Sequence, residues 1–186
     1  TFSSWDPDGD GTDEIKGLVG VRLVDCRNVN VKNCDFQNFT RFGTQSKLST
    51  NVEFKNCPAH NCGDDGHTVS NQFYQTQEGH DITFDNCNGW NCGDQGIEIE
   101  DGATHVLVKN GRYWGNDTDQ ATIKSHGGSG NTNEAACEHI TFENCTFVSD
   151  VAAGWGLKFY GSFTGQCRDW NVNDCTFIVD GGAGGL

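Results

Sequence analysis

The segment Asn51-Val-Glu-Phe-Lys-Asn-Cys57 decides the fold, because related segments occur five more times along the 186 residues. Each copy has two apolar residues at alternate positions, such as Val52 and Phe54, which predicts a strand with one face inward. A single coil cannot bury that face alone and must stack on its neighbours. The sequence therefore predicts an all-β protein, a right-handed parallel β-helix that forms a solenoid of about six coils. The other copies begin at Asn28, Asp81, His105, His139 and Asp169.

A second strand is predicted about ten residues after each repeat, at 67–70, 97–100, 121–124 and 157–160. In this alignment Val69, Ile99, Ile123 and Phe159 point into the coil. The alternate residues then form two outward columns on one flat, exposed face. These columns are Thr68, Glu98, Thr122 and Lys158, and Ser70, Glu100, Lys124 and Tyr160.

An asparagine ends nearly every repeat, where the chain must turn. Stacked at the strand spacing of about 4.8 Å, such amides can hydrogen-bond along the axis, which predicts an internal asparagine ladder with a structural role. Cysteine follows the asparagine in five of the six coils. Two interpretations remain open for the ten cysteines. They form either five local disulfides, for example between Cys57 and Cys62 and between Cys137 and Cys145, or a column of stacked thiols. The ladder residues are Asn33, Asn56, Asn86, Asn110, Asn144 and Asp174.

The composition excludes several classes of function. A net charge of −14 argues against nucleic acid, which requires a basic stripe, and the longest apolar runs are too short for membrane insertion. Ten cysteines favour an oxidising setting, so we expect a secreted or cell-surface protein. Residues 1–19 are predicted to be an acidic segment and residues 20–186 the β-helix domain.

Acidic residues gather in the turns that lead into the exposed face. Stacked coils would bring their oxygens together, and hard oxygen ligands of this kind bind Ca²⁺. A solvated acidic rim, with Glu100 paired to Lys124 on the next coil, is the alternative. The segment Asp6-Pro-Asp-Gly-Asp10 is a separate candidate calcium loop, with Asp6, Asp8 and Asp10 as ligands.

The succession of Asn61-Cys-Gly-Asp-Asp-Gly66, Asn91-Cys-Gly-Asp-Gln-Gly-Ile-Glu98 and Ala121-Thr-Ile-Lys-Ser-His-Gly127 resembles the β-helical pectate lyases of polysaccharide lyase family nine. The resemblance covers roughly residues 60–150. It implies that Asp65, Asp94 and Glu98 bind Ca²⁺ and that Lys124 is the base that removes the proton α to a uronate carboxylate. Gln95 and Glu98 depart from the family pattern, which has aspartates at both positions.

The segment Asp117-Thr-Asp119 followed by Lys124 is similar to the chondroitinase B and alginate lyase family, and this resemblance nominates the same base. Asp117 and Asp119 then join the predicted metal ligands. Arginine does not follow Lys124 closely, so Lys158 is the predicted substitute for holding a substrate carboxylate. Glu100, Tyr160 and His126 complete the predicted substrate-binding set.

Two functions follow from these observations. The first is a secreted polysaccharide-binding β-helix that acts on an acidic polysaccharide as a calcium-dependent polyuronate lyase or epimerase-like enzyme, with a lysine base. The second is a non-catalytic β-helix of a surface fibre, adhesin or phage spike, whose open coil ends allow end-to-end assembly.

Overall fold

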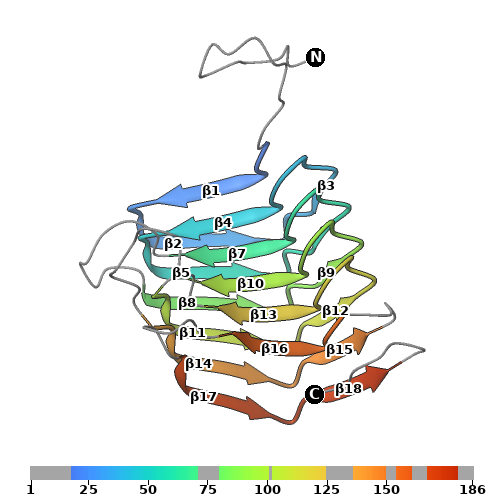
Figure 1. Ribbon diagram of the computed structural model, residues 1–186. Helices are drawn as coiled ribbons and strands as arrows, with labels where there is room; N and C mark the ends of the chain where they lie inside the picture. Colours follow the sequence, from blue (N-terminus) through green and yellow to red (C-terminus); the bar gives the residue numbers. More distant parts are fainter. Residues whose placement is uncertain are drawn as a thin grey trace, which may run out of the picture.

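The computed structural model describes residues 18–70, 80–100, 102–124, 136–149, 154–160 and 167–179. Eighteen strands in this part of the chain stack into three parallel six-stranded sheets, named here sheets A, B and C (Figure 1). Sheet A contains β1 (Val21–Val24), β4 (Thr44–Lys47), β7 (His67–Ser70), β10 (Ile97–Glu100), β13 (Ala121–Lys124) and β16 (Leu157–Tyr160). Sheet B contains β2 (Arg27–Lys32), β5 (Thr50–Lys55), β8 (His80–Asp85), β11 (Thr104–Lys109), β14 (Glu138–Glu143) and β17 (Arg168–Asn173). Sheet C contains β3 (Phe36–Gln37), β6 (Ala59–His60), β9 (Gly89–Trp90), β12 (Arg112–Trp114), β15 (Thr146–Ser149) and β18 (Thr176–Val179).

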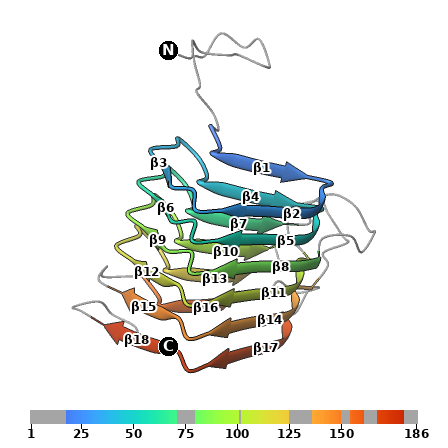
Figure 2. The ribbon, with the colours of Figure 1, turned by 180° about the vertical axis from the view of Figure 1, so that it is seen from behind.

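The chain runs from sheet A to sheet B to sheet C and back, so each coil contributes one strand to each sheet, and Figure 2 shows the same stack from behind. The predicted parallel β-helix is confirmed. The repeat forms sheet B, and the first apolar positions of its six copies are in register, as the repeat predicts: Val29, Val52, Ile82, Val106, Ile140 and Trp170. Trp170 lies on the last strand of that sheet and is 49% exposed. The described residues contain no helix with the length and apolarity needed to cross a membrane.

The core is a continuous stack of apolar side chains inside the coils. Phe54 and Phe84 are fully buried, with ring centroids 5.0 Å apart and nearly parallel planes. One polar ring also lies in this core, because His67 replaces an apolar residue on the inward face of β7 and is 0% exposed. Its Nδ1 is 2.8 Å from the hydroxyl of Thr44, and its Nε2 donates to the carbonyl of Asn88. These contacts satisfy both ring nitrogens of a neutral imidazole.

Sheet C was not predicted from the sequence. Three of its strands have only two residues, too few for an alternating pattern to identify. Its outward face contains a ladder of stacked rings in which His60 and Trp90 lie 4.1 Å apart, and Trp90 and Trp114 lie 4.8 Å apart. Because these rings cover one another face to face, the ladder joins coils and offers few free ring faces.

The predicted asparagine ladder exists, but the prediction that it is internal is wrong. The ladder lies on the outside of the coils. Asn56 donates to Asn33, and Asn86 donates to Asn56, both at 2.9 Å, and all three side chains are exposed. Asn110 departs from the pattern and donates to Asp85. Every ladder residue has a positive φ, which the short polar side chains of Asn and Asp tolerate best. The sharp turn that each coil needs therefore places the amide outward.

The ten cysteines are all thiols in the structure. The predicted thiol column of Cys34, Cys57, Cys87, Cys145 and Cys175 lies at the end of sheet B, interrupted at Gly111. A Cβ at Gly111 would lie 2.9 Å from the hydroxyl of Tyr113, so the buried tyrosine fills the place of the missing thiol. The local pairing of Cys137 with Cys145 is wrong. Those residues flank the whole of β14 and stand roughly 25 Å apart at 3.3 Å per residue.

Candidate functional site

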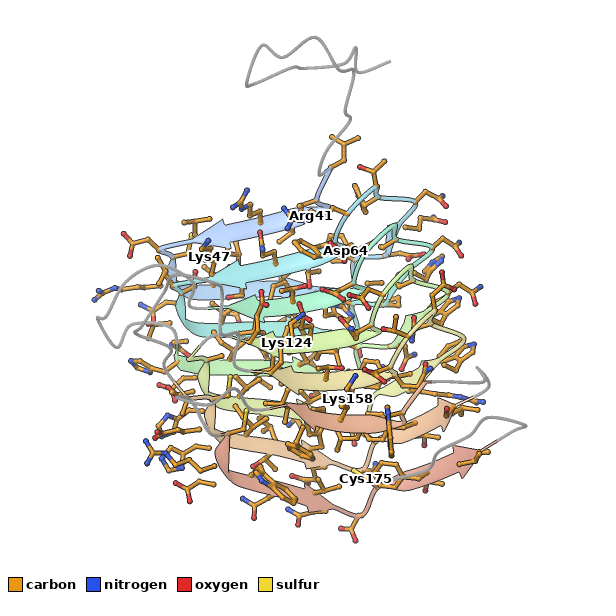
Figure 3. All side chains as sticks on the ribbon, viewed as in Figure 1. Arg41, Lys47, Asp64, Lys124, Lys158 and Cys175 are labelled. Atoms are coloured by element: carbon orange, nitrogen blue, oxygen red, sulfur yellow. The ribbon has the colours of Figure 1, made fainter. Side chains whose placement is uncertain are left out.

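The outward face of sheet A carries Glu98, Glu100, Lys124 and Lys158 in the two predicted columns. The prediction that this face is exposed is wrong for most of it, because Thr68, Glu98, Glu100 and Thr122 are all buried. Glu98 pairs in register with Thr68 and Thr122, and Thr122 pairs with Lys158. Glu100 pairs with Lys124 across β10 and β13. Figure 3 labels Lys47, Lys124 and Lys158 on this face, with Arg41 and Asp64 at the turns that lead into it.

Lys124 forms an ion pair with Glu98 at the centre of this face. Its Nζ contacts Oε1 of Glu98 directly, whereas Oε2 of Glu100 lies 4.0 Å away. The expected Glu100 pair is therefore the longer contact, because the lysine side chain reaches diagonally to the neighbouring column. Glu98 is only 4% exposed.

The surroundings of this pair shift both pKa values. Burial raises the pKa of Glu98, and the attraction of Lys124 offsets only part of that rise. Burial also lowers the pKa of Lys124, but the charge and hydrogen bond of Glu98 outweigh it, so the net pKa of Lys124 is above its ordinary value. Lys124 is consequently an ammonium ion at neutral pH while Glu98 remains charged.

Asp119 and Lys158 form a second ion pair on the same face. Oδ2 of Asp119 accepts from Nζ of Lys158 at 2.9 Å and from the hydroxyl of Thr122 at 3.2 Å. Oδ1 accepts from the backbone N–H of Trp155 at 2.9 Å, on the next coil. Asp119 is 3% exposed and held from three directions, so it fixes the ammonium of Lys158, whose side chain is 39% exposed.

Asp65 makes the same two hydrogen bonds to its turn two coils earlier, but Glu98 stands on the next coil where Asp119 has Lys158. Its Oδ1 accepts from the backbone N–H of Gln95, and its Oδ2 accepts from the hydroxyl of Thr68, both at 3.0 Å. The sequence separations match those of Asp119, since each aspartate bonds the threonine three residues on. The sequence motif Asp-x-x-Thr occurs at both aspartates, Asp65 and Asp119. This motif identifies aspartates that stabilise a turn as well as candidate metal ligands.

Three carboxylates meet at the turns before β7 and β10. Oxygens of Asp64, Asp65 and Asp94 lie within 4.8 Å of one another. Burial raises the pKa of Asp65 well above its ordinary value, and the charges of Glu98 and Asp64 raise it further. Arg41 lies against the group from the preceding coil, with its Nε 3.4 Å from Oδ2 of Asp64. An all-oxygen set of this charge fits a hard cation such as Ca²⁺.

The structure changes the predicted ligand set. Asp64, which the resemblance to the lyases did not imply as a ligand, belongs to the group, whereas Glu98 is held by Lys124. Asp117 is exposed on its turn and aligns with Gly93 instead of Asp94, because its N–H bonds the carbonyl of Cys92. Asp6, Asp8, Asp10 and His126 lie outside the described residues. The backbone of Tyr160 ends β16, but its side chain is not described.

A second group with metal-binding side chains lies at the start of sheet B. Ligand atoms of Glu138, His139 and Asp169 lie within 4.8 Å of one another. Glu138 is already bonded to Arg168, whose Nε lies 2.7 Å from its Oε1. Arg168 lies closer to Glu138 than Arg41 lies to Asp64, at 2.7 Å against 3.4 Å, so it competes more strongly with a cation and the sheet A turns are the better candidate metal site.

Residues 14–185 match the family model described as right handed beta helix region. The chain belongs to this β-helix family. Its similarity to solved structures extends over most of its length. The AlgE6 A-module, a mannuronan C-5 epimerase of Azotobacter vinelandii, matches with a TM-score of 0.51 and 13% identity over 87% of this chain and 58% of that one.

Two further structures give the same result. The AlgE4 A-module of A. vinelandii, also a mannuronan C-5 epimerase, has a TM-score of 0.51 and 13% identity over 90% of this chain and 57% of that one. The periplasmic alginate epimerase AlgG has a TM-score of 0.53 and 10% identity over 87% of this chain and 47% of that one. The chain therefore spans about half the length of these proteins, and identity this low establishes the shared fold alone. No curated protein sequence matches the chain.

Proposed function

We propose that the chain binds an acidic polysaccharide along the face of sheet A and removes the proton α to a uronate carboxylate, as a lyase or an epimerase. The observation that carries this proposal is the desolvated Glu98 and Lys124 pair at the centre of a face that also holds the Asp119 and Lys158 pair. Titratable groups perturbed by burial and by a specific partner are typical of proton-transfer sites. The β-helix relatives named above are alginate and mannuronan epimerases, which favours a polyuronate.

In this proposal Lys124 is the base. Its ammonium first transfers a proton to Glu98, the carboxylate it contacts. Desolvation favours the neutral acid at Glu98 and the neutral amine at Lys124 and so works toward this transfer, whereas the charge of Glu98 holds the ammonium in the protein without substrate. In the proposal a bound polymer removes more water from the pair and thereby promotes the neutral forms. The amine then takes the α proton. Lys158, anchored by Asp119 and partly exposed, is placed to bind a substrate carboxylate.

Ca²⁺ is the proposed cofactor. Asp64, Asp65 and Asp94 would hold the ion. A bound calcium ion would neutralise carboxylates of an acidic polymer and would stabilise the negative charge that develops when the α proton leaves. It would also let a protein with a net charge of −14 bind an anionic substrate.

An extracytoplasmic location completes the proposal. One similar structure is a periplasmic enzyme, and large acidic polysaccharides lie outside the cytoplasm. The ten cysteines agree with an oxidising compartment.

The deciding experiment incubates the protein with alginate, polymannuronate, pectate and chondroitin in D₂O, with and without Ca²⁺. Ultraviolet absorbance of an unsaturated product reports elimination, and deuterium at the α carbon without cleavage, read by NMR, reports epimerisation. Lys124→Ala should abolish either signal. Lys124→Arg should also be inactive, because a guanidinium remains protonated. Lys55→Ala is the matched control, since Lys55 forms a comparable pair with Asp85 at 3.0 Å on sheet B.

A non-catalytic β-helix is the second candidate, and one observation favours it. Lysine–carboxylate pairs join neighbouring coils on sheet B as well, with Lys32 2.7 Å from Glu53. The Lys124 pair would then be one more inter-coil contact. A wild-type protein that leaves every polymer unchanged, with and without Ca²⁺, would reject the enzyme proposal in favour of this one.

A further inference from the structure

Arg41 begins a column of turn residues beside sheet A. The backbone N–H of Asp64 donates to the carbonyl of Arg41 at 3.1 Å, and the N–H of Asp94 donates to the carbonyl of Asp64 at 3.2 Å. The three residues therefore occupy equivalent positions in successive coils. An arginine stands where the next two coils have aspartates of the acidic group, on the same side of the molecule as Lys124 (Figure 3).

The guanidinium of Arg41 is oriented by its neighbours but only loosely bonded to them. Its central carbon lies 4.5 Å from the centroid of the ring of Phe42, a buried residue, and this cation–π contact supports the group from one side. Its Nε lies 3.4 Å from Oδ2 of Asp64, a long contact that engages one of the five N–H donors. The side chain is 53% exposed, so a ligand can reach it from solvent.

Two other arginines with described contacts are placed differently. Arg168 donates to Oε1 of Glu138 through its Nε at 2.7 Å and also through Nη2, so its guanidinium is firmly paired. Arg112 lies over the ring of Trp114, 5.2 Å from its centroid, on sheet C. Arg41 instead combines a place beside the acidic group with a weak ion pair.

We propose that Arg41 binds a carboxylate of the polyuronate, on a sugar unit other than the one that reacts at Lys124, and thereby makes the site selective for long chains. This inference rests on the function proposed above. Arg41 directly precedes the β4 coil, three coils before β13 and Lys124, which is about 14 Å along the axis at about 4.8 Å per coil. One sugar ring cannot span that distance, so the two residues contact different units of one chain.

Exposure and bonding geometry support this assignment. Glu98 and Glu100 are buried, so a polymer that lies along the face of sheet A meets the partly exposed cations Arg41 and Lys158. A planar guanidinium matches a carboxylate with two parallel N–H bonds of 2.7–2.9 Å, which Asp64 at 3.4 Å does not supply. Exchanging Asp64 for a substrate carboxylate costs little, because an exposed ion pair adds little to stability.

The test measures dissociation constants of size-fractionated oligomannuronates and oligogalacturonates, from dimers to octamers, by isothermal titration calorimetry in millimolar Ca²⁺. The wild type should bind oligomers that span three coils more tightly than shorter ones. Arg41→Gln should lose this gain, and its affinity for the longest oligomers should fall roughly 10-fold, because a charge-assisted pair of bonds is missing. Arg41→Lys keeps the charge without the planar donors and should lie between the two.

Arg112→Gln is the matched control. It removes the same charge from an arginine that also lies over an aromatic ring, but on sheet C, and it should bind every oligomer as the wild type does. Urea unfolding of Arg41→Gln should coincide with that of the wild type, which separates a loss of binding from a loss of folding.

Two results would overturn the role of Arg41 while leaving the proposed function intact. One is the same dependence of affinity on length in the wild type and in Arg41→Gln. The other is an equal loss of affinity in Arg112→Gln, which would show that net charge alone is responsible. A wild type that binds no oligomer of any length would instead overturn the proposed function, and this inference with it.

Discussion

The buried His67 should make the protein lose stability in mild acid. Its imidazole is fully buried in the core beneath sheet A, and this burial lowers its pKa from 6.5 to about 4. The unfolded chain therefore binds a proton at this residue at a higher pH than the native protein does. The stability that neutral His67 contributes is complete above pH 6.5 and is lost as the pH falls from 6.5 toward 4.

The size of the loss follows from the two pKa values. At 1.36 kcal/mol per pKa unit, a difference of about 2.5 units corresponds to a limit of about 3.4 kcal/mol. Most of this appears in a narrow range. At pH 7 the contribution is about 0.2 kcal/mol below its maximum and at pH 5 about 2 kcal/mol below it, so the change between them is about 1.8 kcal/mol.

The assay is urea unfolding at pH 7 and pH 5, followed by tryptophan fluorescence, for the wild type and for His67→Gln. Other groups also titrate in this range. The raised pKa of Asp65, for example, makes its contribution to the free energy of unfolding increase as the pH falls. His67→Gln retains these other groups, so the difference between the wild type and the variant isolates the contribution of His67. The wild type should lose about 1.8 kcal/mol more than the variant, or roughly 0.9 M in urea midpoint for an m-value near 2 kcal/mol/M. Equal losses in the two proteins would refute the reasoning.

Three further predictions concern the site and the core. Glu98→Gln removes the carboxylate that accepts the Lys124 proton, so the variant should be active only where the solution pH deprotonates the lysine, and its rate on the active polymer should rise with pH on a limb set by Lys124. A variant that keeps the wild-type pH–rate profile would exclude Lys124 as the base. Millimolar Ca²⁺ should raise the melting temperature of the wild type but not of Asp94→Asn, and Asp169→Asn should respond as the wild type does. Phe84→Ala should cost about 3–5 kcal/mol in a denaturation curve, because it empties the stack on Phe54, and a cost below about 1 kcal/mol would show that the core collapses around the gap.

The sequence was sufficient for the coil repeat and for two of the three sheets. Alternation of apolar and polar residues is a local property with a period of two, so Val52 and Phe54, or Ile97 and Ile99, identify their own inward faces. Once the repeats were aligned, the columns of sheet A followed, and the observed register of Glu100 with Lys124 is the predicted one. The positions of the turns were predictable as well, because asparagine marks them.

Contacts between coils were decided only by the tertiary structure. Lys124 contacts Glu98 instead of its register partner, because a long side chain selects among several neighbours at similar distances. Asp64 joins the acidic group for the same reason, since a turn can direct either of two successive aspartates toward the next coil. Cys62 stacks on Cys92, 30 residues along the chain, because the N–H of Gly93 donates to the carbonyl of Cys62, whereas the nearby Cys57 belongs to another corner. Spacing in the sequence measures distance along a coil. These interactions instead join one coil to the next along the axis of the β-helix. Because the coils differ in length, only their stacking decides which side chains meet.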